Sequence, residues 1–125
     1  MTITDATPRS VEEALRWQQE RIGSTAWEGW ALRFQRLAFG YATESGWARS
    51  ADGFDWLRGH DLVSAGPPPR GALAWFRQGR RITVRCGLGS NKVIGPGVGG
   101  RVGIADYQNL GEYLGWSPVV FPFAR

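Results

Sequence analysis

The sequence predicts a single α+β domain in which N-terminal helices pack on a small antiparallel sheet. Apolar residues recur at helical spacing up to about residue 59, and they alternate at the two-residue spacing of strands from about residue 72 onward. Eighteen glycines in 125 residues supply many tight turns between short strands. Helices first and strands later are typical of this class. We expect residues 10–125 to form the domain behind a flexible leader of residues 1–9.

Two helices are expected in the first third of the chain. The first begins at Ser10, because Ser10 and Glu13 have the spacing of a capping box, in which each side chain accepts a bond from the other residue's amide. Thr25 and Glu28 repeat this spacing before an apolar run that ends at Gly40, a residue type that commonly follows a helix. The second helix is therefore expected to be capped by Thr25, to end at Gly40 and to be largely buried.

Shorter elements are expected after residue 49. A third helix is expected over residues 50–59, with Ser50 as its cap. Residues 60–71 are expected to form a linker, because three consecutive prolines remove backbone donors. The remaining expectations are strands over residues 72–77, 81–89, 91–95, 101–105 and 116–121, a loop over 95–100 and a short helix over 106–115.

Side chains in the strand predicted over residues 81–89 alternate between two faces. Ile82, Val84, Cys86 and Leu88 point one way, and Thr83 and Arg85 point the other. Cys86 therefore lies on an apolar face, where we expect it to be a small buried hydrophobic residue.

The composition limits the classes of function. Hydrophobic residues make up 42% of the chain and charged residues 21%, which is typical of a folded domain and not of a disordered one. The net charge of +4 would suit an anionic partner, but no run of basic residues alternates with aromatic ones, so nucleic acid is the lesser alternative. The single cysteine excludes an intramolecular disulfide and a multi-cysteine zinc site, and no pattern requires a cofactor or a metal.

No targeting segment is visible in the sequence. The first ten residues lack the basic and apolar regions of a signal peptide, and no stretch approaches the roughly 20 apolar residues of a membrane span. We expect a cytoplasmic protein, or one released without an N-terminal signal, that does not associate with membranes.

Five short motifs occur in one order along the chain. They are "AWEGWALRFQRLAFG", the third-helix pattern of Ser50, Ala51 and Trp56, "PPPRGALAWF", "ITVRCGLGSNKVIG" and "RVGIADYQNLGEYLGWS". In this order, over roughly residues 15–118, they resemble the CHAP and NlpC-type group of papain-like cysteine peptidases and amidases, especially small actinobacterial and phage lysin versions. The resemblance implies a papain-like fold with the helix of residues 27–40 packed on a sheet built from residues 71–105.

The chain departs from this family where the reactive groups would lie. The resemblance places the nucleophilic cysteine at Ala31 and the general-base histidine at Thr83. A methyl group cannot attack a carbonyl, and a threonine hydroxyl cannot act as a general base near pH 7. The third catalytic residue would fall within residues 94–97, which offer only Ile, Gly, Pro and Gly. The resemblance thus implies that Ala31 and Thr83 lie close together and that the chain hydrolyses neither peptidoglycan nor peptide amides.

The vacated cleft is the expected binding site. Two tryptophans flank the start of the second helix and a third lies on a neighbouring strand, although core packing would explain at least one of them. The residues expected to line the cleft are Trp27, Glu28, Trp30, Arg33, Tyr41, Trp75, Arg81 and Arg85. Because Thr83 and Arg85 share a strand face, Arg85 would place a cation near the vacated base position.

Three functions are compatible with these features. The first is a catalytically inactive papain-like domain that binds a peptide, a cell-wall muropeptide or a protein partner. The second is an enzyme that uses other chemistry in the same cleft, for which Cys86 and His60, the only thiol and the only imidazole, are the candidates. The third is a basic adaptor that binds nucleic acid or an acidic protein through its surface. Asp52 and Asp55 are interpreted as a solvated helix face.

Overall fold

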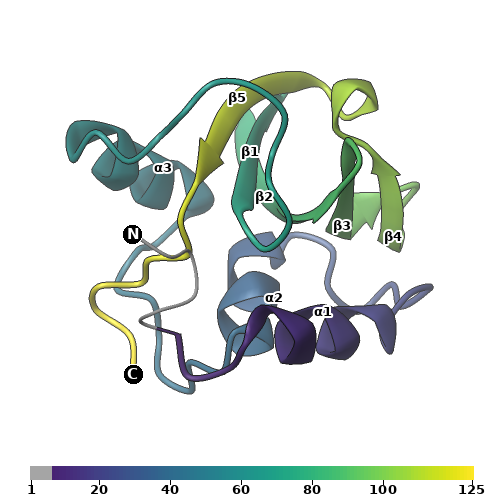
Figure 1. The fold of residues 1–125 in the computed structure, drawn as a ribbon, viewed down its shortest axis with the longest axis horizontal. Coiled ribbons are helices and arrows are strands. Elements are labelled where there is room, and N and C mark those ends of the chain that lie inside the picture. The colour runs from purple at the N-terminus through teal and green to yellow at the C-terminus, as the bar shows by residue number, and fades with distance from the viewer. Residues whose placement is uncertain (1–6) are drawn as a thin grey trace.

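The computed structural model describes residues 7–125, which form an α+β domain with three helices and one five-stranded antiparallel sheet (Figure 1). The helices are α1 (Val11–Gln19), α2 (Ala31–Ala38) and α3 (Ser50–Gly59). The strands are β1 (Leu73–Gln78), β2 (Arg81–Gly89), β3 (Lys92–Val98), β4 (Arg101–Asp106) and β5 (Glu112–Ser117), with a short 3₁₀ helix, η1 (Tyr107–Asn109), before β5. The α+β class and the antiparallel sheet predicted from the sequence are confirmed.

The sheet has the strand order β4-β3-β2-β1-β5. Two-residue turns join β1 to β2, β2 to β3 and β3 to β4. Ser90 and Asn91 both have positive φ, as do Gly99 and Gly100, which is the backbone of the tight turns that match the twist of paired strands. The loop predicted over residues 95–100 is therefore wrong, because β3 continues to Val98 and only two residues form the turn.

The final strand differs from the prediction in both position and partner. Residues 106–115 were predicted to form a helix, but only one 3₁₀ turn forms, and β5 follows at Glu112–Ser117. Gly111 follows this turn with φ +88°, close against the Arg77 carbonyl, and redirects the chain alongside β1. The strand predicted over 116–121 ends early because Pro118 has no amide to donate to a ladder.

The capping box of α1 is confirmed, and that of α2 is wrong. The Ser10 hydroxyl accepts from the Glu13 amide, while the Glu13 carboxylate accepts from the Ser10 amide. Helix α2 begins only at Ala31 and has no side-chain cap, because Gly29 (φ +80°) turns the chain just before it. Glu28, the predicted capping-box partner of Thr25, instead accepts a bond from the Gly97 amide at the end of β3. Gly40 follows the end of α2 as predicted.

Helix α3 begins as predicted at residue 50, but Ser50 is not its cap. Arg49 occupies the cap position without a side-chain cap bond, and the Asp52 carboxylate accepts from the Arg49 amide. Asp55 pairs at the surface with Arg58, in agreement with the solvated face expected for Asp52 and Asp55.

Helix α2 lies against β2 and β3, α1 lies beside α2, and α3 also contacts β2 (Figure 1). Gln18 of α1 and Gln35 of α2 are fully buried and exchange two amide hydrogen bonds of 2.9 and 3.1 Å. The Gln35 amide also reaches the Ile94 carbonyl of β3 at 3.4 Å. This pair fixes the spacing of two helices and a strand without leaving a buried amide unpaired.

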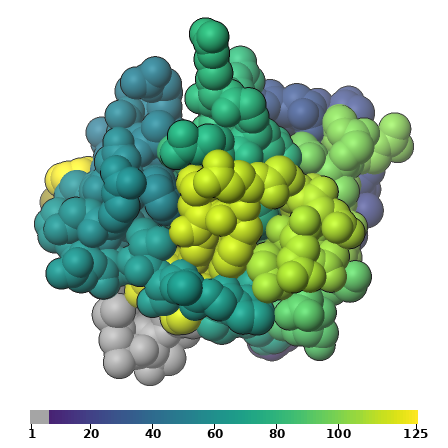
Figure 2. Space-filling model, turned by 90° about the horizontal axis from the view of Figure 1, so that it is seen from above, coloured from purple at the N-terminus to yellow at the C-terminus, as the bar shows by residue number. Residues whose placement is uncertain are grey.

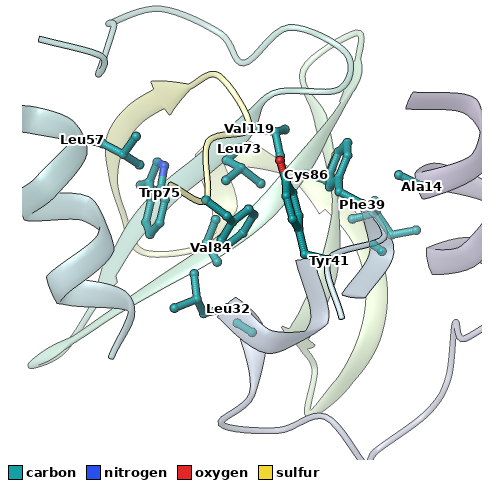
Figure 3. Packing of buried hydrophobic residues seen from close by; sticks show 14 of the residues in the cluster. Ala14, Leu32, Phe39, Tyr41, Leu57, Leu73, Trp75, Val84, Cys86 and Val119 are labelled. Carbon is teal, nitrogen blue, oxygen red and sulfur yellow. The ribbon is translucent and has the colours of Figure 1, made fainter. Parts of the chain in front are cut away.

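Each face of the sheet has its own apolar cluster. On the helical face, Trp75, Val84 and Cys86 belong to the main core together with Leu57 and Tyr41 (Figure 3). The opposite, concave face carries a smaller cluster of Ala74, Phe76, Val93 and Leu110. Both faces of β1 are therefore buried, which explains its unbroken run of buried residues from Leu73 to Phe76.

Two terminal segments close the core at the end of α2. Of the predicted leader, residues 1–6 lie outside the described residues, whereas Arg9 bonds through its amide to the Phe39 carbonyl and through its guanidinium to the Leu37 carbonyl. Arg9, which was predicted to belong to the leader, therefore contacts the end of α2. At the other end, Val119 and Phe121 are buried, and the Arg125 main chain bonds to residues 42 and 43. No helix in residues 7–125 combines the length and apolarity needed to cross a membrane.

The core thiol gives the first testable prediction. Burial raises the pKa of Cys86 to about 12, from the 9.0 of an exposed thiol. The pKa of Cys86 is higher in the folded protein than in the unfolded chain. The contribution of the neutral thiol to the unfolding free energy is therefore complete below pH 9 and declines as the pH rises toward 12. Between pH 8 and pH 10 the wild-type protein should therefore lose about 1.4 kcal/mol more unfolding free energy than Cys86→Ala. Urea unfolding at both pH values measures this difference, and parallel losses in the two proteins would contradict it.

Candidate binding groove

Three adjoining hollows form one groove at the start of α2. The central hollow, of about 770 Å³, lies between residues 48–51 and the tip of the β1–β2 hairpin, which projects at the rim of the molecule in Figure 2. It shares Glu28 and Arg81 with a second hollow of about 200 Å³, and Trp30 and Arg49 with a third of about 380 Å³. We call the three together the groove.

The groove brings together the two positions that the resemblance assigned to catalysis. Ala31, the first residue of α2, and Thr83 of β2 both line the second hollow, as predicted. Pro96 and Gly97 of β3 line it as well, at the place of the third catalytic residue. These four residues provide one hydroxyl and no group that titrates near neutral pH.

Backbone hydrogen bonds of Gly97 fix the wall of the second hollow. The Gly97 amide donates to the Glu28 carboxylate at 3.0 Å, and the Gly97 carbonyl accepts from Nη2 of Arg85 at 2.9 Å. Gly97 has φ +82°, a backbone conformation that other residues rarely adopt, and a Cβ there would also lie 2.8 Å from Arg85 Nη2, so glycine is favoured at this position. The segment before α2 is thereby fixed to the end of β3.

Arg85 is buried and lies behind the groove wall. It is 0% exposed, its guanidinium lies over the Phe76 ring, and Nε and Nη1 have no hydrogen-bond partner among the described residues. Burial lowers the pKa of Arg85 to about 10, and the negative charge of Glu28 opposes this shift. Arg85 lies near Thr83 on β2, as predicted, but it does not line the groove, so that part of the prediction is wrong.

Tyr41 and Trp75 were also predicted to line the cleft, and both belong to the core. Trp75 is fully buried, packs on Phe54 and donates from its indole nitrogen to Ser117 Oγ at 2.9 Å. Tyr41 is 7% exposed and packs on Phe121, at the opposite end of α2 (Figure 3). Neither residue lines any of the three hollows.

The two tryptophans before α2 have different environments. Trp30 is 54% exposed, lines the central and third hollows, and has the Arg33 guanidinium 5.6 Å from its ring centre. Trp27 is half-buried and packs edge-on against Trp17 and Phe34. Trp30 is therefore available to a ligand, whereas Trp27 mainly supports the packing of α1 against α2.

Arginines that the sequence analysis missed line the central hollow. Arg80 and Arg81 lie at the tip of the β1–β2 hairpin and face Arg49, the residue before α3. Only Arg81 was predicted. The sequence gives no signal for the other two, because the fold alone brings a hairpin tip next to a helix that begins 31 residues earlier.

The candidates for other chemistry lie outside the groove. Cys86 is fully buried in the core, and its raised pKa keeps the thiol protonated near neutral pH. His60 follows α3, where its ring stacks on Trp56 at 3.8 Å and its Nδ1 contacts the Trp56 carbonyl at 2.7 Å. Cys86 and His60 therefore form no catalytic pair. Within residues 7–125, no three His, Cys, Asp or Glu side chains lie together as metal ligands would.

Arg85 leads to a prediction about stability. Replacing a buried, partly unsatisfied cation by an apolar side chain of similar length often leaves a protein as stable as before, or more so. We expect Arg85→Met to keep the unfolding free energy or raise it by about 1 kcal/mol. Arg85→Ala, the control, should lower it by several kcal/mol, roughly 2–4, because it leaves a cavity. Urea unfolding at pH 7 measures both, and similar large losses in both variants would mean that the charge itself stabilises the fold.

The positions of Cys86 and His60 predict the absence of hydrolysis. Incubation with peptidoglycan or with a fluorogenic peptide amide should release no amine above background, because neither a cysteine nor a histidine is among the described residues that line the groove. Cys86→Ala and His60→Ala should behave like the wild type. Turnover that either substitution abolishes would contradict this placement and establish an unexpected active site.

Comparison of the chain with protein-family models, with curated proteins and with solved structures found no match.

Proposed function

We propose that the protein is a catalytically inactive, papain-like binding module that holds a peptide, a cell-wall fragment or a segment of a protein partner in the groove. One observation carries the proposal: Ala31 and Thr83, where the family would have its nucleophile and base, line the same hollow and offer no reactive group. The groove is open, although Ala31 and Thr83 supply neither the thiol nor the imidazole that the family's reaction would need. Selection for binding explains such a site better than selection for turnover.

The lining of the groove supports recognition of an extended ligand. Exposed backbone at Gly29 leaves room for a main chain, and Trp30 offers an aromatic surface beside it. Tryptophan is among the residues that most often dominate binding energy when a ligand covers it. Arg33, above the same ring, limits the orientations available to the indole.

The test is a pair of tryptophan substitutions with a matched control. Trp30→Ala should weaken binding of a soluble muropeptide or a degenerate peptide pool by about 1–3 kcal/mol, with little change in thermal stability because the side chain is half exposed. Trp27→Ala should instead lower the unfolding free energy by about 3 kcal/mol, since its ring packs in the helical layer. Ile104→Ala, exposed on β4 and outside the groove, should change neither.

Isothermal titration calorimetry gives the affinities, and thermal unfolding confirms that each variant is folded. Binding that survives Trp30→Ala but disappears at high salt would favour a basic adaptor that uses its surface. Binding by the wild type that none of the three substitutions affects would place the ligand elsewhere.

A further inference from the structure

The charges in the groove are unevenly distributed. Arg49, Arg80 and Arg81 all line the central hollow, and among the described residues none of them forms an ion pair. Three other arginines do pair with carboxylates: Arg58 with Asp55, Arg70 with Glu12 and Arg77 with Glu112. Three like charges facing one hollow repel one another, and a bound anion would remove that repulsion.

Other groups add to the positive potential of the central hollow. The cap residue of α2, Trp30, and the first residue of α3, Ser50, both lie on its wall, and neither helix has a side-chain bond from its cap residue. The positive end of α2 therefore lies at the hollow, whereas the Asp52 carboxylate, which accepts from the Arg49 amide, offsets part of that of α3. Arg85 is fully buried, has two nitrogens without a partner in residues 7–125, and bonds to the Gly97 carbonyl in the adjoining wall. These groups favour a negative charge on the ligand, held at the centre of the groove.

The outer hollows carry both charges. Glu28 lines the central and second hollows together with Arg81, and Glu44 lines the third together with Arg33, Arg36 and Arg49. A nucleic-acid strand needs a continuous basic path for its regularly spaced phosphates, and these two carboxylates interrupt such a path. A peptide can place a single acidic side chain at the centre and neutral backbone on either side. The position of the arginines between two hollows also suits an internal side chain better than a chain terminus.

We propose that the groove binds an extended peptide segment with an acidic side chain held by Arg49, Arg80 and Arg81 and a neighbouring apolar or aromatic side chain packed on Trp30. This inference rests on the proposed function, because it assumes that the groove is the ligand site. It adds the class of ligand. A carboxylate at the centre would receive charge-assisted hydrogen bonds, which are about twice as strong as neutral ones. The packing on Trp30 would be shared by acidic and neutral peptides.

The experiment compares matched peptide pools. Fluorescein-labelled, C-terminally amidated octapeptides carry Glu-Glu, Gln-Gln or Lys-Lys at the centre and an equal mixture of Ala, Ser, Leu and Tyr at the other positions. Fluorescence anisotropy measures their binding to the wild-type protein, to Arg80→Gln/Arg81→Gln and to Arg16→Gln/Arg101→Gln. The last variant removes the same net charge from exposed sites outside the groove, so it controls for long-range attraction. A labelled sixteen-residue oligothymidylate tests nucleic acid.

The wild type should bind the Glu pool about tenfold more tightly than the Gln pool, and the Lys pool most weakly. Arg80→Gln/Arg81→Gln should abolish the preference for Glu while retaining the affinity for the Gln pool. The control double variant should keep the preference. Equal binding of the Glu and Gln pools by the wild type, or equal losses in both double variants, would overturn the inference.

The remaining outcomes separate this inference from the proposed function. If both pools bind equally and Trp30→Ala weakens both, the groove is a binding site without acid selectivity. If neither the pools nor the soluble muropeptide bind, the proposed function fails and the inference with it; if only the muropeptide binds, the inference alone is wrong. If the oligothymidylate binds more tightly than the Glu pool and depends on Arg80 and Arg81, the ligand is a nucleic acid and the acidic-peptide inference is wrong.

Discussion

The structure depends on the burial of α2, a helix of eight residues that does not stabilise itself. A helix this short is marginal in water, and α2 also lacks a side-chain cap at its first turn. Tertiary contacts replace both: Phe34 packs between Trp17 and Trp27, and the paired amides of Gln18 and Gln35 link α2 to α1 and to β3. Because the groove begins at the first turn of α2, any change that shifts this helix also shifts Ala31 and Trp30.

The Gly97 peptide connects the groove to the second, smaller core. On one side it bonds to Glu28, just before α2, and on the other to Arg85, which lies over Phe76 of the concave cluster. A buried guanidinium whose Nε and Nη1 have no partner within residues 7–125 carries a desolvation cost, since the charge leaves water without full compensation. Through its bond to the Gly97 carbonyl, Arg85 places this charge directly behind the wall of the groove.

The sequence was informative where local patterns decide the structure. Alternation along residues 81–89 identified the strand with its correct bounds, and the spacing of Ser10 and Glu13 identified the start of α1. Alternation could not reveal that both faces of the sheet are buried, so Arg85 was expected in a cleft. The spacing of aromatic residues along the chain also does not distinguish a core residue from a groove residue. Trp75 was therefore expected in the groove but lies in the core, whereas Trp30 lines the groove as expected. Arg49 and Arg80 were missed because only tertiary folding brings them together.

The short turns of the sheet have a consequence for how the molecule folds and opens. Strands β1 to β4 are joined by two-residue connections, so their pairing needs little loop closure. The contacts that complete the groove are far more distant in sequence: Gln35 meets Ile94 across 59 positions and Glu28 meets Gly97 across 69. Non-local contacts form late because chain entropy must be lost before they are made. We therefore expect the meander of strands to form first and the groove last, and partial opening to remove the groove while the strands stay paired.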